Sequence, residues 1–249
     1  MRVISYNTLA QRYVDPYIEI RYKYVTNTTC LTWAYRKSLL MEQIDKINAD
    51  IVCLQEVELE TFEDDFLEFI DMMNYNYNRH TISKARSSPI GNITMWKKDK
   101  YVCGNFIQKS CALISTITDN ETNECIIIAN VHLRAGLYTH ETDRKSQLLS
   151  ILKLKPDIIC GDFNDDLKEV GLLYPIIIKN DYSITSNQLT CSVYNEHNKT
   201  INWFSFDNVI VKNQINKIIK VNKCNKIKQI PNKKHPSDHL PLIFIVENK

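Results

Sequence analysis

The sequence predicts a layered α/β domain in which helices pack on stacked sheets. Short apolar runs typical of strands alternate with segments whose apolar residues repeat at helical spacing. The 249 residues, 44% of them hydrophobic, are enough to bury one large core. No repeat, low-complexity linker or break in composition divides the chain, so we expect a single domain over residues 1–249.

The first third of the chain predicts two strands and two helices. An apolar run at the start predicts a strand over 1–7, and the aperiodic polar and aromatic residues 11–32 predict an ordered loop. Apolar residues at positions 35, 39, 40, 44 and 47 predict a helix over 33–48. A strand over 50–55 and an acidic amphipathic helix over 60–73 follow.

The rest of the chain contains most of the predicted strands. Turn signals separate short apolar runs, which predict strands over 75–81, 92–96, 101–108, 111–118, 125–132, 157–160, 204–211 and 240–247. Helical spacing returns over 139–152, directly before the strand at 157–160. Helices interleaved with this many strands favour stacked sheets covered by helices.

Charge and hydropathy exclude two classes of protein. The formal charge of +2 is too small for a polycation, although residues 208–237 contain eight lysines and no acidic residue. This segment is interpreted either as a surface that follows a polyanion or as a solvated lysine face. No apolar run approaches the roughly 18 residues that span a bilayer, so we expect no membrane partner.

The cysteines bear on the cellular compartment. Eight are scattered along the chain without a CxxC pair, and Cys53 and Cys160 lie inside apolar strand runs. Buried free thiols in a reducing compartment fit this pattern better than disulfides or a zinc cluster. The chain opens without a signal-peptide pattern. We therefore expect a cytoplasmic or nuclear protein, and the sequence leaves its oligomeric state open.

Polar residues recur where apolar strands end, and they define the candidate site. They are Asn7, Glu56, His132, Asp162, Asn164, Asp207, Asp238 and His239. Each alone has a structural explanation, such as a helix cap or a hydrogen-bonded core histidine. Six strand tips in one chain that carry Asp, Asn, Glu or His favour a common site, because buried charge needs a partner, a metal or a solvated cleft.

The segment PDIICGDFNDD, residues 156–166, is the densest of these. A glycine-containing turn would explain it, and so would a phosphate-and-metal site. Within it we assign Asp162 and Asn164 to the site. We expect Asp165 and Asp166 to begin the next helix, where acidic side chains favour the positive end of the helix dipole.

The residue types indicate the chemistry. Carboxylates and an amide without a cysteine cluster suit a hard cation such as Mg²⁺ or Mn²⁺. Two histidines add groups that can stabilise negative charge on a phosphoryl oxygen. The chain contains no P-loop, GxGxxG or GxSxG motif. The residues therefore predict a metal-assisted phosphodiesterase or phosphatase.

The ordered motifs SYN, LQEV, NVHL, GDFN, FDNVIV and SDHLPL span Ser5 to Leu242 and resemble the endonuclease/exonuclease/phosphatase superfamily. The resemblance implies a four-layer α/β sandwich, with two mixed β-sheets packed face to face, helices outside and an active site at one rim. It implies that Glu56 is the principal Mg²⁺ ligand, with Asn7 beside it and Asp238 as a metal-side partner.

The resemblance also implies roles in catalysis. Asp162 would align or deprotonate the attacking water, and Asn164 would position the phosphate. His239 would stabilise the transition state with its ring oriented by Asp207, and His132 would contact the scissile phosphate. Arg134, which follows in a loop, is left open between a phosphate contact and a structural role, and Arg36 is expected to be a structural ion-pair partner.

A finer resemblance is to the deadenylase-like branch, which comprises the carbon-catabolite-repression-type poly(A) nucleases, angel and nocturnin. It depends on SYNTLAQRY, WAYRKSLLMEQI, VHLRAG and DRKSQLLSIL. Leu9 stands where the apurinic endonucleases carry an acidic residue, which argues against that branch. The pair Gly91-Asn92 departs from the usual Asp-Gly. Aromatic residues near the rim, which include both stacking and core candidates, are Tyr138, Trp203, Phe204 and Phe206.

Three functions remain open at this point. The first is a Mg²⁺-dependent 3′–5′ exoribonuclease, a deadenylase, that acts on single-stranded adenine-rich RNA and releases 5′-nucleotides. The second keeps the site but hydrolyses a small adenine nucleotide, either a 2′–5′ oligoadenylate or the 2′-phosphate of NADP. The third is a catalytically inactive RNA-binding module.

Overall fold

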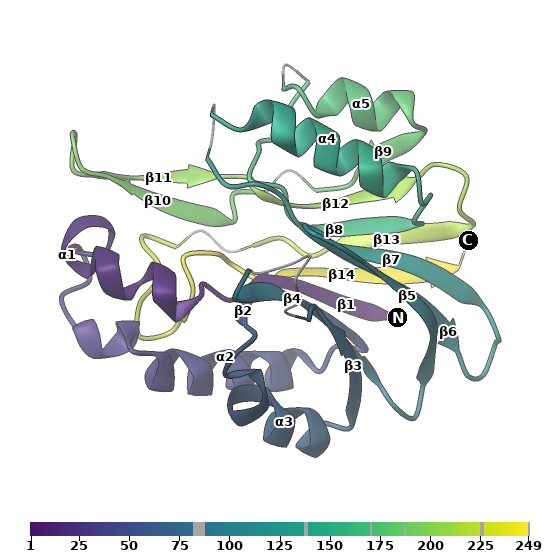
Figure 1. Cartoon of the computed structure of the whole chain (residues 1–249), viewed down its shortest axis with the longest axis horizontal. Helices are drawn as coiled ribbons and strands as arrows, with labels where there is room; N and C mark the ends of the chain where they lie inside the picture. The colour runs from purple at the N-terminus through teal and green to yellow at the C-terminus, as the bar shows by residue number, and fades with distance from the viewer. Residues whose placement is uncertain (82–87, 137–138, 170, 187, 225–226, 249) are drawn as a thin grey trace.

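The computed structural model describes residues 1–249 except 82–87, 137–138, 170, 187, 225–226 and 249. Two six-stranded sheets pack face to face, and helices cover their outer faces (Figure 1). This arrangement confirms the predicted four-layer α/β sandwich. Among the described residues, no helix combines the length and apolar character needed to cross a membrane.

The first sheet has the strand order β13-β14-β1-β2-β4-β3. Its strands are β1 (Arg2–Asn7), β2 (Ile51–Glu58), β3 (Tyr75–Arg79), β4 (Ile90–Lys97), β13 (Lys217–Val221) and β14 (Leu242–Asn248). Strands β1 and β2 are parallel, whereas β14 pairs with β1 in the antiparallel sense. The sheet is therefore mixed, as predicted.

The second sheet has the order β5-β6-β7-β8-β12-β9. Its strands are β5 (Tyr101–Lys109), β6 (Ala112–Asp119), β7 (Cys125–His132), β8 (Ile158–Asp162), β9 (Tyr182–Ile184) and β12 (Asp207–Lys212). Again one pair, β7 and β8, is parallel, and β12 runs antiparallel to β8.

Helices α2 (Trp33–Ile47) and α3 (Phe62–Met72) cover the first sheet, and α4 (Glu141–Leu152) and α5 (Tyr174–Lys179) cover the second. The apolar side chains of α2 and α3 pack on their sheet in one cluster, and those of α4 and α5 form another. A third cluster, which includes Val3, Ile158 and Phe244, fills the space between the sheets. Burial of both faces explains why the central strands are continuous apolar runs.

The strand–helix–strand units β1–α2–β2 and β7–α4–β8 determine where the polar strand tips meet. In each unit a helix joins two parallel strands, so both strands end at the same edge of their sheet. The parallel pair of each sheet ends on the same side of the sandwich (Figure 1). The ends of β1, β2, β7 and β8 therefore form one rim of the sandwich.

Several elements differ from the prediction. The strand expected over 204–211 is β12, which begins at Asp207, because Phe204 ends β11 (Thr200–Phe204), a strand that was not predicted and that pairs with β10 (Cys191–Asn195) in a separate hairpin. The expected loop 11–32 contains α1 (Ile18–Arg21) and three short 3-10 helices around a small apolar core. Strands β9, β10 and β13 and helix α5 were not predicted, since each is short and lacks a clear period. Cys53 and Cys160, which lie inside the predicted apolar strand runs, are buried thiols.

Candidate active site

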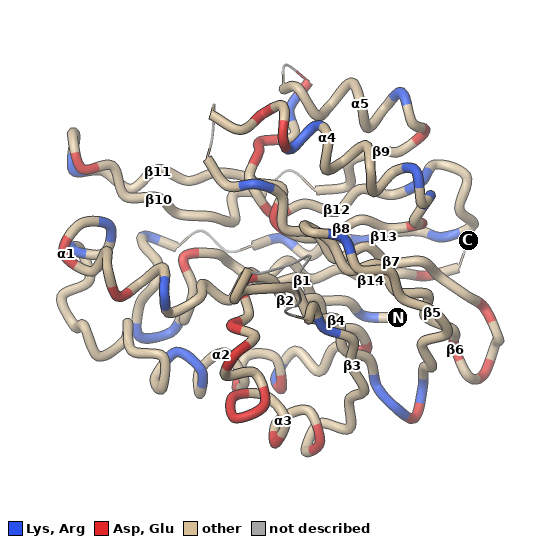
Figure 2. The backbone as a smooth tube through the Cα atoms, viewed as in Figure 1, with Lys and Arg blue, Asp and Glu red and all other residues tan. Residues whose placement is uncertain are grey.

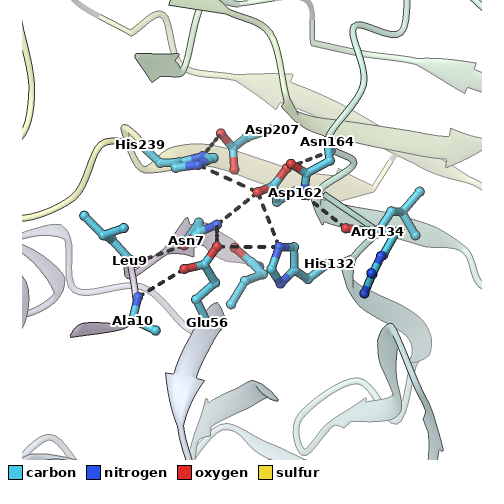
Figure 3. Close-up of polar contacts among 12 residues, drawn as sticks. Asn7, Leu9, Ala10, Glu56, His132, Arg134, Asp162, Asn164, Asp207 and His239 are labelled. Carbon is cyan, nitrogen blue, oxygen red and sulfur yellow. Dashed lines mark hydrogen bonds and ion pairs between the residues drawn. The ribbon is translucent and has the colours of Figure 1, made fainter. Parts of the chain in front are cut away.

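Three side chains from the two sheets meet at the centre of the rim. The amide of Asn7, at the end of β1, donates to Glu56 Oε1 at 3.0 Å and to Asp162 Oδ2 at 2.9 Å (Figure 3). Asn7 is fully buried and Asp162 is 1% exposed. One amide therefore holds a carboxylate of each sheet at a fixed separation.

Glu56 occupies an irregular position in β2. Its φ is 56°, in the left-handed region that β-strand residues rarely adopt, and the pairing of β2 with β4 shifts register between Leu54 and Val57. The bulge directs the Glu56 carboxylate toward the rim, where Ala10 N donates to Oε2 at 3.1 Å. Backbone strain at a polar side chain is typical of functional sites.

The turns after β1 and β8 have the same construction. Asn7 Oδ1 accepts a hydrogen bond from Leu9 N at 2.9 Å, and Asp162 Oδ1 accepts one from Asn164 N at 2.8 Å. Leu9 and Asn164 have φ values of 58° and 48°. The second oxygen of Asp162 therefore remains directed toward the centre of the site.

Gly161 is required at this point of β8. A Cβ atom there would lie 2.0 Å from the carbonyl oxygen of Val131, and φ is 141°. The glycine allows β7 and β8 to approach closely, which brings Asp162 beside His132 at the end of β7. The motif GDFN is thus a turn and also part of the polar cluster.

His132 faces both carboxylates. Its Nε2 lies 3.6 Å from Glu56 Oε1 and 3.8 Å from Asp162 Oδ2. The amide of Asn164 donates to the carbonyl of Leu133 at 3.0 Å, which ties the turn after β8 to the loop after β7. Arg134, in that loop, is exposed at the edge of the cluster (Figure 3).

His239 and Asp207 form a buried pair beside Asp162. His239 Nδ1 lies 2.8 Å from Asp207 Oδ2, and His239 Nε2 lies 3.7 Å from Asp162 Oδ2. Burial alone would lower the pKa of His239, but Cys191, Asp207 and Asp162 together raise it well above its usual value. The pKa of Asp162 is raised, chiefly by burial and in part by Asp207.

Asp238 lies next to this pair. Tyr22 donates to its Oδ2 at 3.1 Å, while its Oδ1 is buried and has no hydrogen-bond partner among the described residues. Burial raises the pKa of Asp238, and the nearby Glu56 adds to the rise. The structure thus brings all nine predicted site residues to one rim, and Tyr22 joins them without having been predicted.

The donor set fits a divalent cation. Ligand atoms of Glu56, His132 and Asp162 all lie within 4.8 Å of one another. Carboxylate oxygens dominate this group, and Asp238 Oδ1, which accepts no hydrogen bond from the described residues and lies 4.0 Å from His239 Nε2, is a further oxygen at this rim. Hard cations prefer such oxygen-rich sets. The residues present therefore fit Mg²⁺ or Mn²⁺.

A cavity of about 360 Å³ opens beside the cluster. Asn164 and Asp238 are among the residues that line it, and so are five aromatic residues: Tyr22, Tyr24, Tyr194, Phe204 and Phe206. The rings of Phe204 and Phe206 stack with centroids 4.8 Å apart. The expected rim position of these two phenylalanines is confirmed, Trp203 is not among the lining residues, and Tyr138 lies outside the described residues.

Two expectations about neighbouring residues were wrong. Asp165 and Asp166 do not begin a helix, because the next helix is α5, and Asp165 instead pairs with the buried Arg144 at 3.4 Å. Arg36 does not form an ion pair within the described part of the chain and instead donates to backbone carbonyls. The backbone acceptors of Arg36 leave no trace in residue types, and the contact between Asp165 and Arg144 is tertiary, so the sequence could predict neither partner.

A model of the Endonuclease/Exonuclease/phosphatase family matches residues 4–239. The chain belongs to this family. The predicted resemblance is thereby confirmed, and membership assigns the chain to the metal-dependent phosphoester hydrolases.

Curated relatives point to the deadenylase-like branch. The CCR4-Not complex 3′-5′-exoribonuclease subunit Ccr4 of Candida albicans is 26% identical over an alignment of 323 residues that covers 97% of this chain. The chain spans 40% of that relative's length. The Carbon catabolite repressor protein 4 homolog 1 of Arabidopsis thaliana is 44% identical over 73 residues, 29% of this chain and 12% of the relative.

Solved structures share the fold of this family member. ANGEL2, described as a 2′,3′-cyclic phosphatase and bound to adenosine-2′,3′-vanadate, aligns with a TM-score of 0.78 and 16% identity over 98% of this chain and 94% of its own. The human Nocturnin catalytic domain, with bound sulfate, aligns with a TM-score of 0.73 and 18% identity over 100% of this chain and 93% of its own.

Proposed function

We propose that this chain is a Mg²⁺- or Mn²⁺-dependent 3′–5′ exoribonuclease, a deadenylase, that acts on single-stranded adenine-rich RNA and releases 5′-nucleotides. The observation that carries the proposal is the cluster around Asn7, Glu56, Asp162 and His239 beside an aromatic cavity. We further propose that residues 1–249 act as one catalytic domain in a reducing compartment, which the buried thiols of Cys53 and Cys160 support.

Glu56 is the proposed principal ligand of the metal, with Asn7 beside it and Asp238 on the metal side. A bound divalent cation would neutralise charge on the phosphoryl oxygens. Asn7 donates to the carboxylates of Glu56 and Asp162, so it also fixes the distance between the metal ligand and the residue that handles water.

Asp162 is the proposed residue that aligns or deprotonates the attacking water. Its Oδ1 is held by Asn164 N, which leaves Oδ2 to face the centre. Burial raises its pKa, and a raised pKa makes a carboxylate a stronger base once it is ionised. Asn164 lines the cavity and is proposed to position the phosphate.

His239 is proposed to stabilise the charge that develops on the phosphate, because its pKa is raised and Nε2 faces the centre of the site. Asp207 would hold the ring and its tautomer through Nδ1. On the opposite side, His132 is proposed to contact the scissile phosphate and Arg134 a neighbouring phosphate oxygen.

The aromatic cavity supports a nucleotide substrate. Bases of single-stranded RNA stack on aromatic side chains, and Phe204 and Phe206 line the cavity close to Asn164. The Ccr4 relatives are named 3′-5′-exoribonuclease subunits, which favours RNA, and the sequence motifs favour adenine-rich RNA.

The test is a substrate panel with purified protein in Mg²⁺ or Mn²⁺. The arms are labelled oligo(A), mixed-sequence RNA, single-stranded DNA, a 2′–5′ oligoadenylate and NADP, each with wild type and Glu56→Ala. We expect stepwise shortening of oligo(A) from its 3′ end by the wild type alone. Equal shortening by Glu56→Ala would refute the assignment, and binding of RNA without turnover would support the inactive RNA-binding module instead.

A second candidate is hydrolysis of a small adenine nucleotide. The cavity volume of about 360 Å³ lies at the low end of the range for small-ligand pockets, which suits one nucleotide. The structural neighbour ANGEL2 is described as a 2′,3′-cyclic phosphatase. An additional arm with RNA that ends in a 2′,3′-cyclic phosphate, together with the NADP and 2′–5′ arms, separates this candidate from the exoribonuclease.

A further inference from the structure

Two arginines with fully buried side chains lie behind the rim. Arg36 on α2 and Arg144 on α4 are both 0% exposed. A buried guanidinium is costly unless its donors are satisfied, so its partners show what it stabilises. In both cases backbone carbonyl oxygens of rim loops dominate the partners.

Arg36 joins two loops that are distant in sequence. Nη1 donates to the carbonyls of Thr8 and Pro236, both at 3.0 Å, and Nη2 donates to that of Leu9 at 2.7 Å. Thr8 and Leu9 directly follow Asn7, and Pro236 lies three residues before His239. One planar group therefore holds the Asn7 turn against the loop that carries Asp238 and His239.

Arg144 makes the corresponding contacts in the other half of the molecule. Nη1 donates to the carbonyls of Arg134 at 3.1 Å and Gly136 at 2.9 Å, in the loop that follows β7. Its Nε lies 3.4 Å from Oδ2 of Asp165, the residue that follows Asn164 in the sequence. The loop behind His132 is thus held against the turn behind Asp162.

The two arginines occupy equivalent positions in the fold. Arg36 is the fourth residue of α2 and Arg144 is the fourth residue of α4. Each helix joins the two parallel strands of one sheet, so its first turn lies beside the rim. The same position in both strand–helix–strand units thus carries the same kind of contact, one in each sheet.

We propose that Arg36 and Arg144 are positioning residues that set the geometry of the active site from behind. Arg36 fixes Asn7 and Glu56 relative to His239, and Arg144 fixes His132 relative to Asn164. The kinetic consequence rests on the proposed function, whereas the order of the rim loops does not.

The guanidinium group suits this task better than an ammonium group. It presents several donors in a rigid plane, which matches carbonyls that arrive from two loops, whereas lysine offers a point charge on a flexible stem. Burial lowers the pKa of Arg36, while Asp238, Tyr22 and Glu56 raise it. The cation behind the rim therefore also offsets the carboxylates in front of it.

Hydrogen exchange of Arg36→Ala and Arg144→Ala, followed by mass spectrometry, tests the proposal without any substrate. In Arg36→Ala we expect faster exchange in residues 8–11 and 236–239 alone, and in Arg144→Ala in residues 133–136 and 163–166 alone. Tyr75→Phe is the matched control, because buried Tyr75 also donates to a backbone carbonyl, that of Ala49 at 2.5 Å. It should change neither pair of segments.

Kinetics with the best substrate of the panel supply the second readout. Displacement of catalytic groups by about 1 Å costs about 100-fold in rate, so we expect kcat of either alanine variant to fall by about that factor, with KM within about threefold of wild type. Millimolar guanidinium should restore part of the lost kcat, and it should leave Tyr75→Phe unchanged.

The outcomes separate the two proposals. Unchanged exchange in the named segments, or faster exchange throughout the protein, overturns the positioning role, as does an unchanged kcat. Where an alanine variant does not fold, Arg36→Lys or Arg144→Lys is measured in the same way, with the same criteria. A wild type inactive on every substrate refutes the proposed function, while the exchange result still decides the role of the arginines.

Discussion

Replacement of Asp207 by asparagine tests how the His239 pair works. Asp207 is fully buried, and its Oδ2 lies 2.8 Å from His239 Nδ1. Asparagine has nearly the same shape and keeps an oxygen that can accept from Nδ1. The substitution therefore removes the negative charge while the ring retains a hydrogen-bond acceptor.

The size of the effect follows from the charge. Two opposite charges about 4 Å apart interact by about 4 kcal/mol at an effective dielectric constant of about 20. If His239 carries its positive charge in the transition state, most of this energy is lost there in Asp207→Asn. A loss of about 3–4 kcal/mol corresponds to a fall in kcat of about 10²- to 10³-fold.

The assay is steady-state hydrolysis of the best substrate at saturating Mg²⁺, with thermal unfolding as a check on the fold. Asp71→Asn serves as a matched control, since the Asp71 side chain is 78% exposed and pairs with Lys98 at the surface. If Asp207 acts through His239, the double variant Asp207→Asn/His239→Ala should be no slower than His239→Ala alone. A folded Asp207→Asn with less than about a tenfold fall in kcat would refute the reasoning.

Three further predictions concern the metal, the substrate and the core. Glu56→Gln should raise the Mg²⁺ concentration for half-maximal activity at least about tenfold, because a ligand charge is lost, and an unchanged Mg²⁺ titration would contradict its role. Phe204→Ala should raise KM for oligo(A) at least about fivefold through loss of a stacking surface, with little change in kcat, whereas an unchanged KM would place the base elsewhere. Phe66→Ala, at a core position that is 1% exposed, should lower the free energy of unfolding in urea by about 3–5 kcal/mol without changing KM; a loss below about 1 kcal/mol would contradict the described packing.

The sequence was sufficient for the layered class and for most of the polar residues that the structure brings to one rim, for one physical reason. Strands buried on both faces are continuous apolar runs, so a polar residue at the end of such a run is conspicuous. Asn7, Glu56, Asp162 and His239 all stood out in this way. The local periodicity of α2, α3 and α4 was equally visible, because each has one face on a sheet.

The residues that the sequence could not assign act through the backbone or through long-range contacts. Arg36 and Arg144 contact carbonyl oxygens, and no pattern of side chains predicts such partners. Asp165 followed an ordinary rule for helix starts, yet the tertiary contact with Arg144 decided its role. The strand expected over 204–211 began at Phe204, which instead ends β11, since β11 belongs to a separate hairpin with β10.

These contacts explain how side chains from two different sheets can be held in fixed positions relative to one another. Functional side chains lie at the ends of strands from different sheets, and hydrogen bonds link these strands directly: Asn7 donates to Asp162, and Gln55, beside Glu56, donates to Asn130 of β7. The loops, which otherwise would set the geometry, are fixed from the outer helical layers by Arg36 and Arg144. The positions of the side chains at the rim therefore depend on the first turns of α2 and α4 as well as on the strands. Surface substitutions at the far ends of these helices should leave kcat in the steady-state assay unchanged, whereas substitution of Arg36 or Arg144 in their first turns should lower it.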